Sequence, residues 1–297
     1  NSKQHSYRDL PLRLGELGLV HRHEKSGELH GLFRVRNFTQ DDAHLFVTPD
    51  QVEAEIQHTI DLFDEVYNTF GLTYVAELST RPDDSMGTDE DWELATNGLR
   101  KALEHRGLDY IVNEGDGAFY GPKIDFHLKD SIGRTWQCGT IQYDMQMPEK
   151  FNLTYVGEDG EKHRPIMLHR VVYGSIERFI GILIENYAGA FPTWLAPVQA
   201  RILPITDKQA DYAYELRKKM FDLGLRIEVD DRSEKIGKKI RESQMLKTPY
   251  SLVVGDQEMA DGTVAVRKYG EQQSETMKVE DFIAYLQDQI ATKAKKF

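Results

Sequence analysis

Apolar residues recur at helical spacing in two stretches of the first half of the chain. One covers residues 52–70 and is followed by Gly71, and the other covers residues 92–103 and is followed by Gly107. Glycine directly after a periodic stretch is a common signal for the end of a helix. Both stretches therefore predict amphipathic helices.

Short apolar or alternating runs lie between and after these helices. They are rich in β-branched and aromatic residues, and they cover residues 74–78, 110–112, 123–128 and 134–143. Such runs predict strands. Together with the two helices they indicate one sheet with helices packed on a face, which is an α+β arrangement.

A third apolar-periodic stretch, "HRVVYGSIERFIGILIENYAG", predicts a helix over residues 169–189. The next segment, "AFPTWLAPVQARILPI", contains three prolines and interrupts the pattern, so we predict a domain boundary between residues 195 and 196. Beyond it, strand-like and helix-like stretches alternate up to residue 290. This alternation predicts a small α/β domain with a mixed sheet.

Composition and charge narrow the function. The chain has 297 residues, a hydrophobic content of 40% and a net charge of −12, which argues against indiscriminate binding of nucleic acid but allows a local RNA-binding patch. Its one cysteine, Cys138, excludes an internal disulfide and a cysteine-based zinc cluster within the chain. No apolar run reaches membrane-spanning length and no signal-peptide pattern opens the chain, so we expect a cytoplasmic protein. The chain begins at Asn1 rather than at Met, so we expect further residues upstream.

The segment "FRVRNFTQDDAH" carries unusual chemistry for a strand. Alternate residues of a strand share one face, and here that face would present Arg34, Arg36, Phe38, Gln40, Asp42 and His44. With Arg22 and Glu24 on a partner strand, and a turn between them, the segment predicts a hairpin. Arginine binds phosphate through its planar fork and an aromatic ring stacks on a base, so a nucleotide is the expected ligand. The alternative is a solvated hairpin held by salt bridges.

A second polar group interrupts the apolar helix predicted over residues 169–189. Glu177 and Arg178 lie among apolar residues, and Gly174 precedes them. Buried charges are costly unless they are paired and hydrogen-bonded. We therefore expect specific partners for both side chains.

These residues resemble signature motifs of the class II aminoacyl-tRNA synthetases. "RHE" with "RVRNF" resembles the second motif, and "GSIER" resembles the third. Further segments resemble the threonyl-tRNA synthetase family of bacterial type, namely "RVRNFTQDDAH", "GAFYGPKIDF", "QCGTIQYDM", "YVGEDGEKHRPIMLHRVVYGSIERF" and "FPTWLAPVQ". The segments "DDRSEKIGKKIRE" and "VVGDQE" are similar to the anticodon-binding domain of that family, so the resemblance covers essentially the whole chain.

The resemblance implies a fold and a reaction. The fold is an α+β catalytic domain with a mainly antiparallel sheet over residues 1–195, lacking the first motif, followed by an α/β anticodon-binding domain over residues 196–297. The reaction is the ATP-dependent activation of threonine, with magnesium, and transfer of the threonyl group to the 3′ end of tRNA(Thr) by a threonine–tRNA ligase. The family also implies a homodimer.

The resemblance also assigns the nucleotide-binding residues. Arg22 would bind the α-phosphate, Glu24 the adenine amino group and Arg34 the distal phosphates. Phe38 and Arg178 would enclose the adenine ring, and Gln137 would complete the site. Arg22 and Arg178 are thus the expected catalytic residues.

For the amino acid, the resemblance implies a zinc ion held by His44, His169 and a cysteine expected upstream of Asn1. Cys138 does not match that cysteine. The candidates for threonine binding are Gln40, Asp42, Tyr120, Lys123 and Gln142. Tyr120 could instead be a core tyrosine. Gln137 and Gln142 have opposite parity, so both can face one pocket only if the strand has a bulge or bend near Gly139.

In the second domain the resemblance favours Ser233, Lys235, Glu258 and Arg267 as anticodon-binding residues. The basic run Lys235, Lys238, Lys239 and Arg241 could dock RNA phosphates or be a solvated surface. Two alternatives to a ligase remain from the sequence. One is a non-catalytic tRNA-binding or regulatory relative with the same fold, and the other is a histidine-metal hydrolase unrelated to translation.

Overall fold

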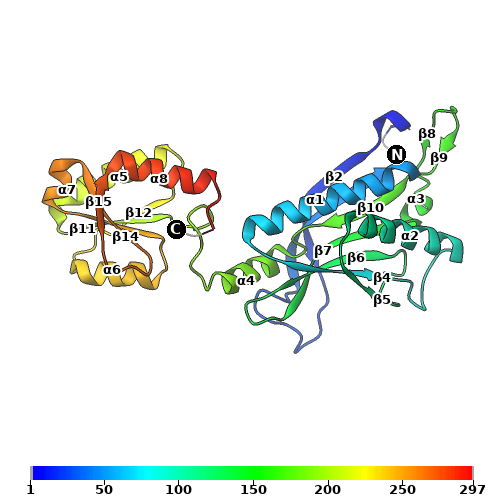
Figure 1. Ribbon diagram of the computed structural model, residues 1–297, viewed down its shortest axis with the longest axis horizontal. Coiled ribbons are helices and arrows are strands. Elements are labelled where there is room, and N and C mark those ends of the chain that lie inside the picture. The colour runs from blue at the N-terminus through cyan, green and yellow to red at the C-terminus, as the bar shows by residue number, and fades with distance from the viewer. Residues whose placement is uncertain (1–2, 296–297) are drawn as a thin grey trace. The chain divides into compact units, whose positions relative to one another are not determined.

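The computed structural model describes residues 3–295. The chain divides into two compact units between Glu185 and Asn186, and each is described by itself (Figure 1). The boundary expected between residues 195 and 196 stays a prediction. Within the described residues, no helix has the length and apolar character needed to cross a membrane.

The first unit is built on a seven-stranded sheet with strand order β2-β3-β10-β7-β6-β4-β5. All neighbouring strands in it are antiparallel except β4 and β5, which are parallel, as the prediction of a mainly antiparallel sheet requires. A small second sheet has the order β1-β8-β9. The elements of this unit are β1 (His5–Ser6), β2 (Leu12–His21), β3 (Asn37–Val47), α1 (Val52–Phe70), β4 (Tyr74–Ser79), α2 (Asp89–Arg106), β5 (Tyr110–Asn113), β6 (Lys123–Lys129), β7 (Thr135–Asp144), α3 (Gln146–Lys150), β8 (Tyr155–Val156), β9 (Lys162–His163), β10 (Ile166–Val171) and α4 (Ile176–Asn186).

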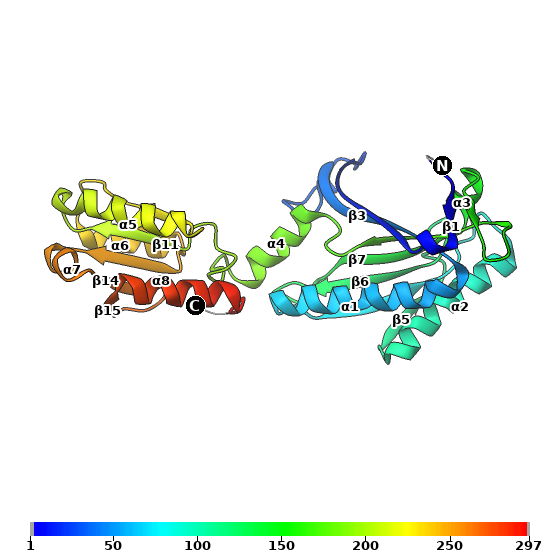
Figure 2. The same ribbon diagram turned by 90° about the horizontal axis from the view of Figure 1, so that it is seen from above.

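The predicted helices α1 and α2 lie along one face of this sheet (Figure 2). Gly71 and Gly107 end them in the left-handed conformation, with φ of 71° and 67°, as their sequence positions predicted. Phe63 of α1 packs edge-on against Phe126 of β6, with ring centroids 4.5 Å apart. Because these helices occupy one face, the polar side chains of alternate strand residues are left on the other.

The helix predicted over residues 169–189 is wrong at its beginning. His169 and Val171 belong to β10, which is paired on both sides, with β3 and with β7. Gly174 then adopts a φ of 69°, and α4 begins only at Ile176. The apolar residues of β10 are as typical of a central strand as of a buried helix, so the hydrophobic pattern alone could not distinguish the two.

The predicted hairpin is shorter than the sequence pattern indicated. Strand β2 ends at His21 and β3 begins at Asn37, so Arg34 and Arg36 lie in a connecting loop and not on the strand. Gly27 and Gly31 have φ of 91° and 48° and turn the loop back on itself. The strand face predicted from Arg34 to His44 is therefore correct only from Phe38 onward.

The second unit is the predicted α/β domain with a mixed sheet. Its five strands have the order β12-β11-β13-β14-β15, with β11 parallel to both of its neighbours and the pairs β13–β14 and β14–β15 antiparallel. The elements are β11 (Ala200–Pro204), α5 (Ala210–Asp222), β12 (Ile227–Val229), α6 (Ile236–Met245), β13 (Tyr250–Val254), α7 (Asp256–Asp261), β14 (Thr263–Lys268), β15 (Glu275–Lys278) and α8 (Val279–Ala291). The short elements α7 and β15 were not predicted, because neither is long enough to show a period.

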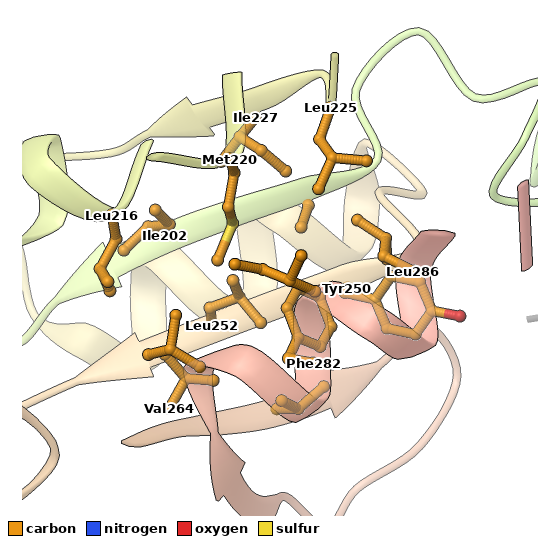
Figure 3. Packing of buried hydrophobic residues seen from close by; sticks show 14 of the residues in the cluster. Ile202, Leu216, Met220, Leu225, Ile227, Tyr250, Leu252, Val264, Phe282 and Leu286 are labelled. Atoms are coloured by element: carbon orange, nitrogen blue, oxygen red, sulfur yellow. The ribbon is translucent and has the colours of Figure 1, made fainter. Parts of the chain in front are cut away.

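The core of this unit lies between the sheet and the helices α5 and α8. Figure 3 shows Leu216 and Met220 of α5 and Phe282 of α8 meeting Leu252 of β13, and all four are buried. Helix α6 lies on the opposite side of the sheet in Figure 1. The five-stranded sheet is thus covered by helices on both faces.

Candidate active site

Two adjoining pockets open on the face of the seven-stranded sheet that α1 and α2 leave uncovered. We call the first the arginine pocket; its lining residues are Arg22, Glu24, Phe33, Arg34, Val35, Phe38, Gln40, Gln137, Cys138, Thr140, Val171, Gly174, Ser175 and Arg178. We call the second the histidine pocket; its lining residues are Arg22, Gln40, Asp42, Asp116, Gly117, Ala118, Tyr120, Lys123, Gln137, Thr140, Gln142, His169, Arg170 and Val171. The two walls share Arg22, Gln40, Gln137, Thr140 and Val171. A ligand in one pocket would therefore lie next to a ligand in the other.

The six residues that the resemblance assigned to the nucleotide all line the arginine pocket. The Arg22 guanidinium carbon lies 5.1 Å from the centroid of the Phe38 ring. Arg34, although it is outside the strand, reaches the pocket and pairs with Glu24 at 2.9 Å. Phosphate oxygens would compete with this carboxylate for the Arg34 guanidinium.

Glu177 and Arg178 have the partners that their position in an apolar helix demanded. The Glu177 carboxylate accepts hydrogen bonds from the backbone N–H of Thr39, at 3.0 Å to each oxygen. The Arg178 guanidinium donates to the backbone carbonyls of Phe33 and Gln137, both at 2.8 Å. Burial lowers the pKa of Arg178. These bonds fix α4 against the strand and the loop that form the arginine pocket.

Asp41 makes a second link between these segments and was missed by the sequence reasoning. It is 8% exposed and lies on the helix-covered face of β3. Its carboxylate accepts hydrogen bonds from three consecutive backbone N–H groups, those of Val172 at 2.7 Å, Tyr173 at 3.1 Å and Gly174 at 3.0 Å. Burial raises the pKa of Asp41, and the backbone donors act in the opposite direction. Asp41 thus holds the turn that leads into α4.

The expected strand irregularity near Gly139 is present. The register of β6 and β7 shifts between Phe126–Gly139 and His127–Gln137, which leaves Cys138 as the extra residue. A Cβ at position 139 would lie 2.6 Å from the Tyr67 hydroxyl, so only glycine fits there. The bulge turns Gln137 to the same face as Gln142, and both line the histidine pocket.

The two predicted metal ligands lie together, with His169 in the wall of the histidine pocket and His44 next to it on β3. His44 and His169 are paired across β3 and β10, and their ring centroids lie 4.6 Å apart. Asp42 joins them, and ligand atoms of the three residues lie within 4.8 Å of one another. Two facing imidazoles are donors that suit zinc, and the Asp42 carboxylate beside them can accept a hydrogen bond from a group bound there, so the residues present fit the metal.

Asp144 orients one of these histidines. It is fully buried, and its Oδ2 lies 2.8 Å from Nε2 of His169. When Nε2–H donates to this carboxylate, Nδ1 keeps its lone pair for a metal. The sequence reasoning missed Asp144. Its position two residues after Gln142, a predicted pocket residue on the same strand, is a signal that could have placed it near the metal site.

The predicted threonine-binding residues Gln40, Asp42, Tyr120, Lys123 and Gln142 all line the histidine pocket. The Tyr120 hydroxyl donates to the Gln142 side-chain carbonyl at 2.8 Å, so Tyr120 is a wall residue and not a core residue. Burial raises its pKa. Lys123 forms ion pairs with Asp125 at 2.8 Å and with Asp116 at 3.2 Å.

The candidate anticodon residues are spread over separate elements of the second unit. Ser233 and Lys235 are exposed just before α6. Glu258 lies on α7 and accepts from the Gly255 N–H at 2.8 Å, and Arg267 lies on β14 and donates to the Glu271 carbonyl at 2.9 Å.

The basic run expected on α6 is interrupted. Lys239 is 2% exposed, and its ammonium donates to the Pro204 carbonyl. Lys238 pairs with Glu234. The run is therefore a smaller cationic surface than its sequence suggested.

Comparison with known families gives two matches. Residues 1–187 match the family model described as tRNA synthetase class II core domain (G, H, P, S and T), and residues 199–289 match the one described as anticodon binding domain.

Curated relatives match nearly the whole of this chain. A threonine–tRNA ligase from Desulforamulus reducens is 66% identical over 292 residues, which is 98% of this chain and 46% of the relative. A threonine–tRNA ligase from Acetivibrio thermocellus is 65% identical over 291 residues, with the same coverage. The chain therefore spans about half the length of the curated relatives it matches.

A solved structure agrees with both comparisons. The crystal structure of the RNA binding domain of threonyl-tRNA synthetase from Cryptosporidium parvum superposes with a TM-score of 0.92 and 42% sequence identity, over 96% of this chain and 72% of that one.

Proposed function

Because this chain belongs to the class II aminoacyl-tRNA synthetases, in the threonyl-tRNA synthetase family, we propose that its first unit activates threonine with ATP and that its second unit binds tRNA(Thr). The reaction would be that of a threonine–tRNA ligase, with magnesium accompanying ATP.

One observation carries this proposal more than any other. The arginine pocket and the histidine pocket share Arg22, Gln40 and Gln137. Activation of an amino acid requires its carboxylate to meet the α-phosphate of ATP, so two adjacent sites with a cation at their junction are needed. This arrangement supports a two-substrate reaction at Arg22.

The roles in the arginine pocket follow from its chemistry. Phe38 offers a ring face to adenine, and Arg178 lines the same pocket. Glu24 can accept from the adenine amino group, and Arg34 is the cation that phosphates would draw away from Glu24. Arg22 would then bind the α-phosphate.

The bonds that form and break need no general base. A carboxylate oxygen of threonine attacks the α-phosphorus, and the bond to the bridging oxygen of pyrophosphate breaks. The products are threonyl-adenylate and pyrophosphate. Arg22 would stabilise the negative charge on the α-phosphate in the transition state, since such displacements depend on positioning and electrostatics. Transfer to the 3′ end of tRNA(Thr) then releases AMP.

The histidine pocket would select threonine. Asp42 can accept a hydrogen bond from the substrate hydroxyl, and a site that binds a hydroxyl rejects valine, which has none. His44 and His169 would hold zinc, whose Lewis acidity would strengthen binding of the amino and hydroxyl groups. A cysteine upstream of Asn1 would be the third protein ligand. Tyr120, Lys123, Gln40 and Gln142 would bind the remaining polar atoms.

In the second unit, Ser233, Lys235, Glu258 and Arg267 would contact the anticodon. Single-stranded bases are read by donors and acceptors on a surface that separates them. A homodimer and a cytoplasmic location complete the proposal.

The test is exchange of labelled pyrophosphate into ATP. We would measure it for the 297-residue chain and for the Desulforamulus reducens relative carrying this chain in place of its matching segment. Threonine should stimulate exchange strongly, serine less and valine very little. Exchange stimulated equally by unrelated amino acids, or absent from both proteins although ATP binds, would reject the ligase and favour the non-catalytic alternative.

A further inference from the structure

A carboxylate hidden beneath the two pockets contacts three of their wall residues. Asp125 lies on β6 and is 1% exposed. Its Oδ1 accepts hydrogen bonds from Gln137 Nε2 at 2.6 Å and from Thr140 Oγ1 at 2.7 Å, and its Oδ2 lies 2.8 Å from Lys123 Nζ. Asp125 itself lines neither pocket.

The three partners stand at different places in the walls. Gln137 and Thr140 line both pockets, at the junction where the substrates would meet. Lys123 lines only the histidine pocket. Gln137 also lies next to Cys138, the extra residue of the bulge in β7, and its side-chain amide donates to Asp125 and, at 3.2 Å, to the Thr140 hydroxyl.

We propose that Asp125 is a positioning residue that holds Lys123 for the amino acid and Gln137 with Thr140 at the junction of the two substrates. This inference rests on the proposed function and adds to it a residue that touches neither substrate.

The charges around Lys123 agree with this role. Burial lowers the pKa of Lys123, but the carboxylates of Asp125 and Asp116 outweigh it, and the pKa stands above its ordinary value. Lys123 therefore stays protonated at neutral pH. Without the Asp125 charge, burial would act against Asp116 alone, which lies farther away at 3.2 Å, and the pKa of Lys123 would fall.

A neighbouring acid provides a matched control. Glu77 on β4 lies directly opposite Asp125 in the sheet, and a carboxylate oxygen of each lies within 4.8 Å of the other. Glu77 accepts from the Asn113 amide at 2.8 Å, and it lines neither pocket. The substitution Glu77→Gln removes a nearby negative charge without touching a wall residue.

The variants Asp125→Asn and Asp125→Ala distinguish the holding of Lys123 from the holding of Gln137 and Thr140. In Asp125→Asn the amide oxygen can still accept from Gln137 and Thr140, while the amide nitrogen faces Lys123 and cannot pair with it. We expect the KM for threonine in pyrophosphate exchange to rise on the order of tenfold, with the KM for ATP changed less than about twofold. Asp125→Ala releases all three side chains and should raise both constants. Glu77→Gln should change neither.

A second readout needs no substrate. In ¹⁵N-lysine NMR titrations, the pKa of Lys123 should fall in Asp125→Asn and change much less in Glu77→Gln. Thermal unfolding would identify a variant that fails to fold, and the near-isosteric Asp125→Asn keeps the test valid if Asp125→Ala is lost.

The outcomes are distinct. Asp125→Asn with an unchanged threonine KM and an unchanged Lys123 titration overturns the inference, as does an equal effect of Glu77→Gln. No exchange in the unsubstituted chain or in the relative carrying it, together with a lowered Lys123 pKa in Asp125→Asn, rejects the proposed function but supports the anchoring of Lys123 by Asp125.

Discussion

Both units of this chain bury carboxylates and hydroxyls, but the groups that these bond differ. In the first unit three of the buried carboxylates, those of Asp41, Asp125 and Asp144, each bond a residue of a pocket wall or the turn that leads to one. The other two, Glu55 and Asp130, pair with arginines outside the pockets. In the second unit the buried carboxylate of Asp230 pairs with Arg232. The buried hydroxyls of Ser243 and Ser251 bond each other, between α6 and the sheet.

This difference has a physical meaning. A buried carboxylate costs more to desolvate than a hydroxyl, so it persists where its bonds also serve another purpose. Three such carboxylates that bond the pocket walls or the turn beside them indicate a site whose side chains must be held in place. The hydroxyl pair in the second unit satisfies two buried hydroxyls where α6 packs on the sheet.

The largest effect should follow from removing the cation shared by the two pockets. Arg22→Ala should reduce threonine-dependent pyrophosphate exchange by about 10²–10³-fold, as loss of a group that stabilises transition-state charge does. Arg22→Lys keeps the charge but loses the planar fork, so it should recover only part of the rate. Exchange within about threefold of the wild type in Arg22→Ala would show that the junction is not where the substrates meet.

The free energy of unfolding should fall more when a buried carboxylate is removed than when a buried hydroxyl is removed. Asp41→Ala leaves three backbone N–H groups without their acceptor, and we expect the free energy of unfolding of the first unit to fall by about 3 kcal/mol. Ser251→Ala removes one neutral hydrogen bond, and the second unit should lose about 1 kcal/mol. Urea denaturation of both variants measures these values. Equal losses would remove the distinction between the two sheets.

The proposed zinc site beside the histidine pocket can be tested by substituting a predicted ligand and the residue that orients another. His44→Ala should abolish stoichiometric zinc binding and lower threonine activation steeply, and Asp144→Asn should weaken zinc binding about 10–100-fold through His169. The matched control is His163→Ala, because His163 is exposed and pairs with Asp159 outside both pockets. Elemental analysis after dialysis and the KM for threonine are the measurements. Normal threonine activation in His44→Ala would exclude a role for zinc.

The second unit should act on tRNA and not on activation. Arg267→Ala should weaken tRNA(Thr) binding by about tenfold, as loss of one specific contact does, while pyrophosphate exchange stays unchanged. Lys218→Ala is the control, since Lys218 is exposed and pairs with Asp222. Filter binding with tRNA(Thr) and with an unrelated tRNA measures the effect. Unchanged tRNA(Thr) affinity would remove Arg267 from the anticodon site.

Local patterns predicted much of the fold and of the pocket walls. The period of two from Phe38 to Asp42 identified the face of β3 that lines the pockets, because strand side chains alternate strictly. The glycines after α1 and α2 marked their ends correctly, because that conformation favours glycine. In a regular strand Gln137 and Gln142 would point to opposite faces, so the expectation that both line one pocket indicated the bulge of β7.

What could not be predicted depends on contacts between distant residues. Asp41 bonds a turn 131 residues further along the chain, and no local pattern reports such a partner. The loop from residue 22 to 36 is not a strand, because two glycines turn it. Its arginines Arg34 and Arg36 are nevertheless spaced two residues apart in the sequence, which imitates the pattern of a strand. β10 has the apolar character of a helix start, and only its pairing with β3 and β7 identifies it as a strand.

The most direct test of the central claim is to isolate the product of the two adjoining pockets. The chain, inserted into the Desulforamulus reducens relative, would be mixed with ATP labelled at the α-phosphate and with threonine, and the bound material would be analysed by mass spectrometry. We predict threonyl-adenylate at about one per active site, formed only when both substrates are present. Bound ATP that stays intact in the presence of threonine, or AMP released without it, would contradict the claim that the pockets join threonine to the α-phosphate.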